Sequence, residues 1–312
     1  MVEVPDSVLA LAEQRARARE AKEWALADQL RAEIGHAGWL VADTAAGFEL
    51  SLKPPFEQYA SLTDIPVPDV GDVEQGAISI DLIVDGWPED VRACIEALLT
   101  HAPTAARINV LDVGNIDGVG EELERLASLH PRIKIWHVGR NLHDIGWANA
   151  LNFLIRADAA AAHVLMDIST IVTGDAITPL VEALGAGVVL TGWRGVNVNT
   201  DDAWRSFVAA EIPGEVDAVL SYLMAVDAVA ARATPLTAKA KFYRNADLEW
   251  SLMLRAVGGK VVMPAMELPC HQTRHHGYFD SDTDYRERES RKTYDRILQN
   301  FRGKDWLLAP RK

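Results

Sequence analysis

Between residues 78 and 190, short runs of aliphatic and β-branched residues alternate with longer segments of helical composition. The apolar runs are residues 78–84, 108–112, 133–137, 163–167 and 187–190, and the helical segments are residues 88–101, 119–129, 147–157 and 175–184. Strands that alternate with helices of this length favour a parallel sheet, because each parallel connection has to cross one face of the sheet. The sequence therefore predicts an α/β fold with a mostly parallel, Rossmann-like sheet and helices on both faces.

Three aspartates stand at the carboxyl ends of the predicted strands. They are Asp85, Asp112 and Asp167. Ligands of open α/β sheets bind outside this edge of the sheet. A single aspartate there is readily explained as a helix cap, but three at one edge predict a binding site.

Composition and motif content narrow the class of protein. The chain has 312 residues, of which 49% are hydrophobic and 24% are charged, as expected of a globular protein. No apolar run approaches the roughly 20 residues needed to span a bilayer, and the N-terminus does not resemble a signal peptide, so we expect a cytoplasmic protein without a transmembrane segment.

Cys94 and Cys270 are too few and too far apart to predict a disulfide framework or a zinc site. The absence of GxxxxGK[ST], of GxGxxG after the first strand and of GxSxG argues against P-loop enzymes, ordinary dinucleotide dehydrogenases and α/β hydrolases.

The first quarter of the chain differs in composition from the rest. Residues 7–36 predict two helices, the first capped by Ser7, and residues 38–52 predict a hairpin with its turn at 44–47. We therefore predict a helical and hairpin module at 1–53, a linker at 54–76 that is rich in proline and aspartate, and a main domain at 77–312.

The N-terminal module resembles the extreme C-terminal helical subdomain of cysteinyl-tRNA synthetases. The resemblance rests on the run RAREAKEWALADQLR at 17–31, on Gly38-Trp39 and on the segment DTAAG at 43–47. It implies a docking site for tRNA or a protein. The alternative is a scaffold that covers the main domain or forms a homodimer, and the net charge of −14 favours it, because binding to a phosphate backbone depends on Lys and Arg.

The segment KFYRNADLEW at 241–250 contains the strongest catalytic candidate. Asp247 is predicted at the N-terminus of a helix that runs to Gly258. A carboxylate in this position can act as a general base on a bound alcohol. The other interpretation is that Asp247 only caps the helix.

Five motifs in this order resemble the GT-A fold of inverting, family-two-like glycosyltransferases over residues 78–280. They are LDVGNIDG at 111–118, GRNL at 139–142 followed by GWANALN at 146–152, MDISTIV at 166–172, FYRNADLEWS at 242–251, and RHHGY at 274–278. The resemblance implies that Asp247 is the catalytic base. It implies a nucleotide-sugar donor held by Asp85, Asp112, Arg140, Asn152 and Asp167. Acceptor contacts are expected from Trp193, Tyr243, Asn245 and Glu249.

The same resemblance implies a divalent metal, Mn²⁺ or Mg²⁺, beside the diphosphate at Asp167. The family's second aspartate is Ser169 here, so one local anion is missing. Three arrangements remain open: Asp167 with water and phosphates, a shell completed by His275 or His276, or cationic groups in place of the metal. The histidines could equally belong to a surface turn or donate to a phosphate.

Two functions follow from these patterns. The first is an inverting transferase that moves a sugar to a hydroxyl of a glycan, lipid or small-molecule acceptor whose identity the sequence does not give. The second is a GT-A-like protein that binds nucleotide sugars without turnover and docks to tRNA or a protein through residues 1–52. The Asn245–Asp247 segment favours the first, and Ser169 favours the second.

Overall fold

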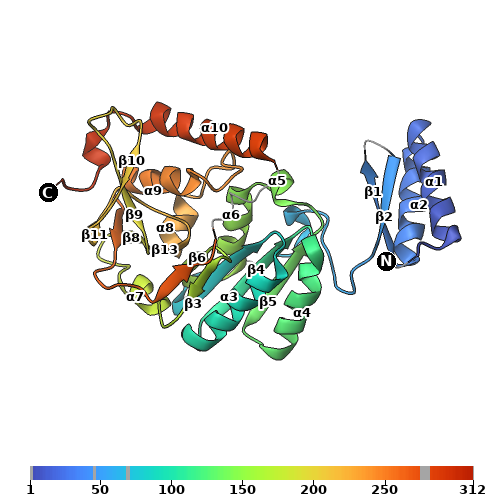
Figure 1. Cartoon of the computed structure of the whole chain (residues 1–312), viewed down its shortest axis with the longest axis horizontal. Helices are drawn as coiled ribbons and strands as arrows, with labels where there is room; N and C mark the ends of the chain where they lie inside the picture. The colour runs from blue at the N-terminus through green and yellow to red at the C-terminus, as the bar shows by residue number, and fades with distance from the viewer. Residues whose placement is uncertain (1–2, 45–46, 68–70, 275–281, 312) are drawn as a thin grey trace. The chain divides into compact units, whose positions relative to one another are not determined.

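The computed structural model describes residues 3–44, 47–67, 71–274 and 282–311. The chain divides into two compact units, Met1–Glu57 and Gln58–Lys312. Figure 1 labels most of the elements of both. Each unit has its own hydrophobic core.

The smaller unit consists of two helices and a hairpin. Helices α1 (Asp6–Glu20) and α2 (Trp24–His36) are followed by the antiparallel strands β1 (Trp39–Thr44) and β2 (Gly47–Leu52). The predicted cap at Ser7 is wrong, because the helix already begins at Asp6 with Pro5 at the N-cap. The buried Arg15 donates to Asp43 over 2.7 Å and fastens α1 to the hairpin.

An eight-stranded sheet forms the centre of the larger unit. The strand order is β11-β14-β8-β13-β6-β3-β4-β5. Their bounds are β3 Glu74–Val84, β4 Arg107–Val113, β5 Ile133–Val138, β6 Ala160–Met166, β8 Val188–Gly192, β11 Gly214–Glu215, β13 Leu223–Asp227 and β14 Lys260–Met263. All neighbours are parallel except where β13 pairs with β6 and β8, and where β11 pairs with β14. The predicted mostly parallel α/β sheet is confirmed.

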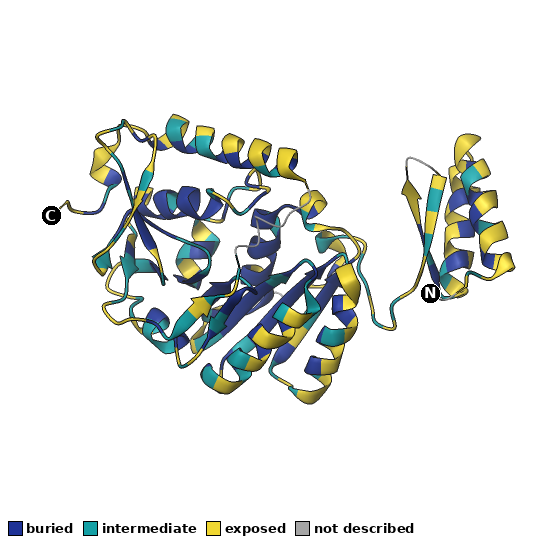
Figure 2. Cartoon of the chain, in the orientation of Figure 1, coloured by how far each residue is buried: buried dark blue, intermediate teal, exposed yellow. Residues whose placement is uncertain are grey.

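Helices cover both faces of the sheet, as predicted. Those of the larger unit are α3 Pro88–His101, α4 Val119–Leu129, α5 Leu142–Ile145, α6 Trp147–Ala157, α7 Ile177–Glu182, α8 Ala228–Ala233, α9 Ala246–Ala256 and α10 Thr283–Phe301. One core cluster packs α3, α4 and α7 on one face, and a second packs α6, α8 and α9 on the other. Figure 2 shows the strands buried and the helices exposed on their outward sides. The helix predicted at 175–184 is shorter because Asp175 accepts the N–H groups of Ile177 and Thr178 and so delays its start.

Smaller elements complete the larger unit. Strands β9 (Gly195–Val198), β10 (Phe207–Ala209) and β12 (Ala218–Val219) form a three-stranded sheet, and β7 (Thr170–Val172) pairs with β15 (Cys270–Gln272). Short 3-10 turns lie at Leu62–Asp64, Ile116–Gly118 and Asp305–Leu307. A third core cluster joins α9 to α10 through Leu248, Leu252, Ile297 and Phe301.

Part of the stretch predicted as a linker packs on the larger unit. The N–H of Tyr59 donates to the carbonyl of His137, and the N–H of Gly139 donates to the carbonyl of Tyr59, both over 2.8 Å. Tyr59 therefore extends the edge of the sheet beside β5. In the described parts of the chain, no helix combines the length and apolar character needed to span a bilayer.

Candidate active site

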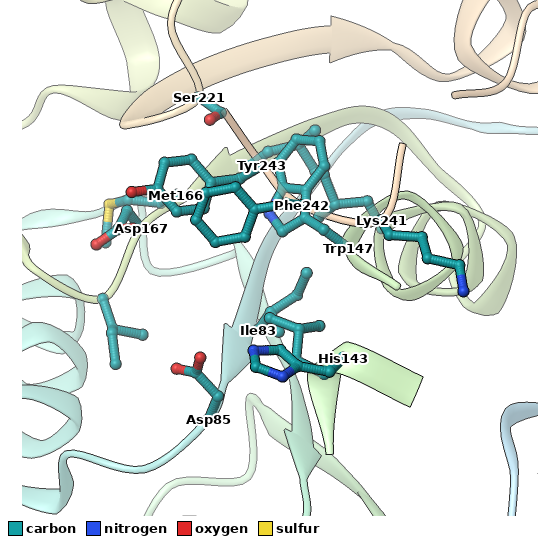
Figure 3. A pocket seen from close by; sticks show the side chains of 14 residues that line it. Ile83, Asp85, His143, Trp147, Met166, Asp167, Ser221, Lys241, Phe242 and Tyr243 are labelled. Atoms are coloured by element: carbon teal, nitrogen blue, oxygen red, sulfur yellow. The ribbon is translucent and has the colours of Figure 1, made fainter. Parts of the chain in front are cut away.

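A pocket opens at the carboxyl ends of the central strands. Strands β3 and β6 are parallel neighbours in which Leu82 pairs with Met166, so the residues that follow them, Asp85 and Asp167, lie at the same edge of the sheet. Both aspartates line the pocket (Figure 3). The remaining wall comes from the end of β6, from α5 and α6, from Ser221, and from the segment 241–243.

Asp167 is oriented by the residue that replaces the family's second aspartate. Its Oδ1 accepts the backbone N–H of Ser169 over 2.8 Å and the Ser169 hydroxyl over 2.6 Å. Ser169 is fully buried, and its carbonyl accepts the N–H of Thr273. Ser169 therefore acts as a hydrogen-bond donor to Asp167 and is not exposed as a ligand.

The described residues offer limited means of holding a metal. None of their His, Cys, Asp and Glu side chains form a group of three that could bind an ion without help from a ligand. Hard divalent ions are often held by one or two carboxylates together with substrate phosphates. Asp167, half-buried and lining the pocket, fits that arrangement. His275 and His276, the other predicted ligands, lie outside the described residues.

Asp247 lies in the first turn of α9 and has an unusual environment. The predicted N-cap position is wrong by two residues, because Asn245, at φ 71°, caps a helix that begins at Ala246. The Asp247 carboxylate is buried and accepts the Ser221 N–H over 2.9 Å, the Ser221 hydroxyl over 3.2 Å and the Leu248 N–H over 2.8 Å.

Burial raises the pKa of the Asp247 carboxyl to about 6, against the lowering effect of these hydrogen bonds. A carboxylate with a pKa near neutrality is suited to general-base chemistry. Because Ser221 lines the pocket, its hydroxyl connects Asp247 to that space.

Two of the predicted acceptor contacts instead fasten α9 to α10. Glu249 is buried and accepts from Arg296 Nε over 2.9 Å and Nη2 over 2.8 Å. The Asn245 amide donates to the carbonyl of Ser290 over 3.0 Å. On a helix, residues two apart face different directions, so Glu249 points away from the site that Asp247 faces. Neither Asn245 nor Glu249 lines the pocket.

Three predicted donor-binding residues are also outside the pocket lining. Asp112 is fully buried and accepts from His137 over 2.7 Å and from the N–H of Asn115 over 3.2 Å. Hydrogen bonds to Asp112 and Glu124 raise the pKa of His137, against the lowering effect of burial. The Asn152 amide is used by the backbone of Leu236. Arg140 is exposed in the loop after β5.

The predicted acceptor aromatics divide between the pocket and the core. Tyr243 lines the pocket, with its ring centroid 4.4 Å from that of Phe242. Trp193 packs against the core cluster of α3, α4 and α7, with the Arg194 guanidinium 4.4 Å from its ring centroid.

Several lining residues are not among the site residues predicted from the sequence. They include Ile83, Leu142, His143, Trp147, Ser221, Lys241 and Phe242. His143 lies in α5, and its ring stacks on Tyr285 of α10 with centroids 4.0 Å apart. Residues 143–145 separate the GRNL and GWANALN motifs and are an insertion relative to the family pattern that these motifs resemble. This insertion was the only sequence signal for this wall. No sequence signal pointed to Ser221, because this residue approaches Asp247 only in the folded chain.

No family model matches the sequence. The curated relatives match a short N-terminal stretch: cysteine–tRNA ligase of Opitutus terrae is 52% identical over 48 residues, which are 15% of this chain and 10% of the ligase. Cysteine–tRNA ligase 1 of Burkholderia lata is 49% identical over 49 residues, 16% of this chain and 10% of that protein. The chain thus spans about a tenth of the length of these relatives.

Solved structures match the larger part of the chain. A mannosyltransferase from Pyrobaculum calidifontis in complex with GDP-Man and Mn²⁺ has a TM-score of 0.55 at 13% identity, covering 94% of this chain and 75% of that one. GalNAc-T7 with UDP, GalNAc and Mn²⁺ has a TM-score of 0.54 at 12% identity, covering 72% of this chain and 48% of that one. At such identities the likeness establishes the fold alone. The larger unit has the GT-A fold.

Proposed function

We propose that this chain is a glycosyltransferase that moves a sugar from a nucleoside-diphospho-sugar to an acceptor hydroxyl with inversion. The observation that carries the proposal is Asp247, a buried carboxylate with a raised pKa, hydrogen-bonded to the pocket residue Ser221. The GT-A fold and the nucleotide-sugar complexes of the structural neighbours support the class of donor.

In the proposed reaction, the Ser221 hydroxyl gives its proton to Asp247 and takes the proton of the acceptor hydroxyl, so Asp247 acts as the base through Ser221. The acceptor oxygen attacks the anomeric carbon from the face opposite the diphosphate, and the bond between that carbon and the diphosphate oxygen breaks. The products are the glycosylated acceptor, a nucleoside diphosphate and the proton on Asp247. The Ser221 hydroxyl, 3.2 Å from Asp247, is the group through which the buried base reaches the pocket. A positioned base of this kind contributes about 10²- to 10⁴-fold to the rate.

The donor side of the pocket is assigned to Asp85 and Asp167. Asp167 would hold a divalent ion together with the diphosphate, and the Ser169 hydroxyl and N–H fix its orientation. When bound, the ion neutralises the charge that develops on the departing diphosphate. To take part in donor binding, Asp112 and Asn152 would have to give up their present partners, His137 and Leu236, and Arg140 would have to reach the pocket from the loop after β5.

A ligand screen tests this proposal. We expect one nucleoside diphosphate and its sugar conjugate to raise the melting temperature of the full chain, because a ligand at 100 times its Kd adds about 2.7 kcal/mol of stability. The selected donor should then release nucleoside diphosphate with an acceptor pool, and NMR of the product should show the opposite anomeric configuration. If no nucleotide sugar stabilises the protein with or without manganese, the proposal is wrong.

Ser169 supports a second candidate, a protein that binds nucleotide sugars without turnover. With one carboxylate at the expected metal position, the site lacks the second anion that would tighten an ion beside the diphosphate. Donor binding without diphosphate release under any metal would favour this candidate.

The N-terminal unit would then serve as the docking module. Its likeness to a segment of cysteine–tRNA ligases suggests tRNA as the partner to test. Because the chain carries a net charge of −14, we expect weak, salt-sensitive binding in a gel-shift titration. Tight binding that persists in high salt would instead identify tRNA as the partner.

A further inference from the structure

A cationic segment leads into the pocket of this acidic chain. The chain has 45 acidic and 31 basic residues, yet residues 228–246 contain no Asp or Glu and four bases. Arg232 donates to the carbonyl of Asp158. The other three, Lys239, Lys241 and Arg244, are exposed, and their side chains form no ion pair or hydrogen bond with any described residue.

The backbone of Lys241 is fixed at the pocket. Its carbonyl accepts the N–H of Trp147 over 2.9 Å, and the carbonyl of Ala240 accepts the N–H of Ala148 over 3.1 Å, so α6 begins on this segment. The backbone from which the exposed Lys241 side chain extends is therefore held in place at the wall of the pocket.

The pocket is polarised along its length. Figure 3 shows Asp85 and Asp167 at one end and the Lys241 side chain extending from the other. The rings of Phe242 and Trp147 lie between them. Under the proposed function, the donor diphosphate occupies the Asp167 end, which leaves the cationic end to the other substrate.

We infer that the acceptor carries an anionic group, a phosphate or a carboxylate, that binds Lys241 at the end of the pocket remote from Asp167, with Lys239 and Arg244 adding to the positive potential. This inference rests on the proposed glycosyltransferase function. An anion gains charge-assisted hydrogen bonds from the exposed Lys241 ammonium group, whereas a neutral sugar gains only weaker ones. The field of the three cations also favours anionic acceptors over neutral ones before contact.

The experiment measures acceptor-side binding with the donor side filled. The full chain is saturated with manganese and whichever of UDP and GDP stabilises it. It is then titrated with glucose 6-phosphate, mannose 1-phosphate and glucuronate, and with neutral glucose and mannose. We expect at least one anion to bind about tenfold more tightly than the neutral sugars, and Lys241→Gln to lower that affinity about tenfold. Lys304→Gln, which removes an exposed cation far along the chain, should leave it unchanged.

A vesicle-binding experiment distinguishes a soluble anionic acceptor from an anionic lipid. Binding to phosphatidylglycerol vesicles but not to phosphatidylcholine vesicles, lost in Lys241→Gln, would support the inference with a lipid as the source of the anion. The inference is overturned if glucose and glucose 6-phosphate bind equally well. It is also overturned if Lys241→Gln and Lys304→Gln have equal effects. It is also overturned if Lys241→Gln lowers UDP or GDP affinity as much as acceptor affinity, because Lys241 then binds the donor. If neither nucleotide sugars nor nucleoside diphosphates bind the wild type, the glycosyltransferase proposal itself fails.

Discussion

Two carboxylates at the pocket, Asp247 and Asp167, and two buried carboxylates away from it, Glu249 and Asp217, have different kinds of partner. Asp247 and Asp167 accept only backbone N–H groups and serine hydroxyls among the described residues. Glu249, two residues from Asp247, pairs with Arg296, and Asp217 pairs with Arg311. The first pair remains available to a proton or a metal, while the second pair holds secondary structure together.

This difference has a physical cause. Hydrogen bonds from neutral donors satisfy a carboxylate's lone pairs without supplying a positive charge, so burial still disfavours ionisation. Burial thus raises the pKa of Asp247 to about 6. An arginine beside Asp247 would lower the pKa of its carboxyl and make it a poorer base, whereas at Glu249 and Asp217 the arginine partner stabilises the charged form.

The largest expected effect is on Asp247. Asp247→Asn should reduce transfer by about 10²- to 10⁴-fold, because the amide keeps the shape but cannot take the acceptor proton. Turnover should rise with pH through about 6 in the wild type, as Asp247 ionises, and this dependence should be absent in the variant. The measurement is kcat/KM from pH 5 to 8, and an unchanged pH profile in the variant would exclude Asp247 as the base.

Asp247→Asn should lower the activity but raise the stability of the protein at high pH. The pKa of Asp247 is raised from 3.8 to about 6, so its favourable contribution is present below pH 4 and is lost as pH rises through 6. The loss is at most about 3 kcal/mol at pH 8. We therefore expect Asp247→Asn to raise the free energy of unfolding at pH 8 and not at pH 4, measured by urea denaturation. The control is Asp217→Asn, which weakens the pair with Arg311 and should lower stability at pH 8.

Glu249→Gln should destabilise the protein by about 2 kcal/mol, because it leaves Arg296 without its charged partner at a largely buried site. We expect kcat/KM to be nearly unchanged in the folded variant, since Glu249 does not line the pocket. The opposite result, normal urea stability with a large rise in acceptor KM, would restore Glu249 as an acceptor-binding residue.

Asp167→Asn should weaken nucleoside-diphosphate binding by about 10- to 100-fold in manganese, or roughly 1.4 to 2.7 kcal/mol. With a chelator the variant and the wild type should bind alike, because the carboxylate acts through the ion. Calorimetry in both conditions measures this, with Asp175→Asn, at the cap of α7, as the matched control. Equal binding by wild type and Asp167→Asn in manganese would show that the site is not metal-assisted.

The smallest effect is expected from Ser169. Ser169→Ala removes one hydrogen bond to Asp167 and should cost about 1 kcal/mol of stability, with a modest loss of manganese-dependent affinity. Ser169→Asp restores the second aspartate of the family pattern. We predict that donor binding then depends more strongly on metal. We also predict lower stability without metal, because a second carboxylate is buried beside Asp167. A variant as stable as wild type in chelator would mean that the two side chains do not face each other.

The sequence by itself determined five of the eight strands of the central sheet, most of its helices and the sheet edge at which we expect the ligand. Local patterns decide these features: β-branched runs predict β3 to β6, helical composition predicts α3, α4 and α6, and the residues after β3 and β6 fall at the same sheet edge by topology. Asp85 and Asp167 were therefore found from strand ends alone.

Only the tertiary structure decided which polar residues are free and which are used in packing. Asn152, Glu249 and Asp112 match the motifs, yet their partners, Leu236, Arg296 and His137, come from distant parts of the chain. The raised pKa of Asp247 likewise depends on burial in the folded chain, which outweighs the lowering effect of the hydrogen bonds from Ser221, 26 residues earlier. Charge state and availability are set by the surroundings of a side chain, and spacing along the sequence does not specify those surroundings.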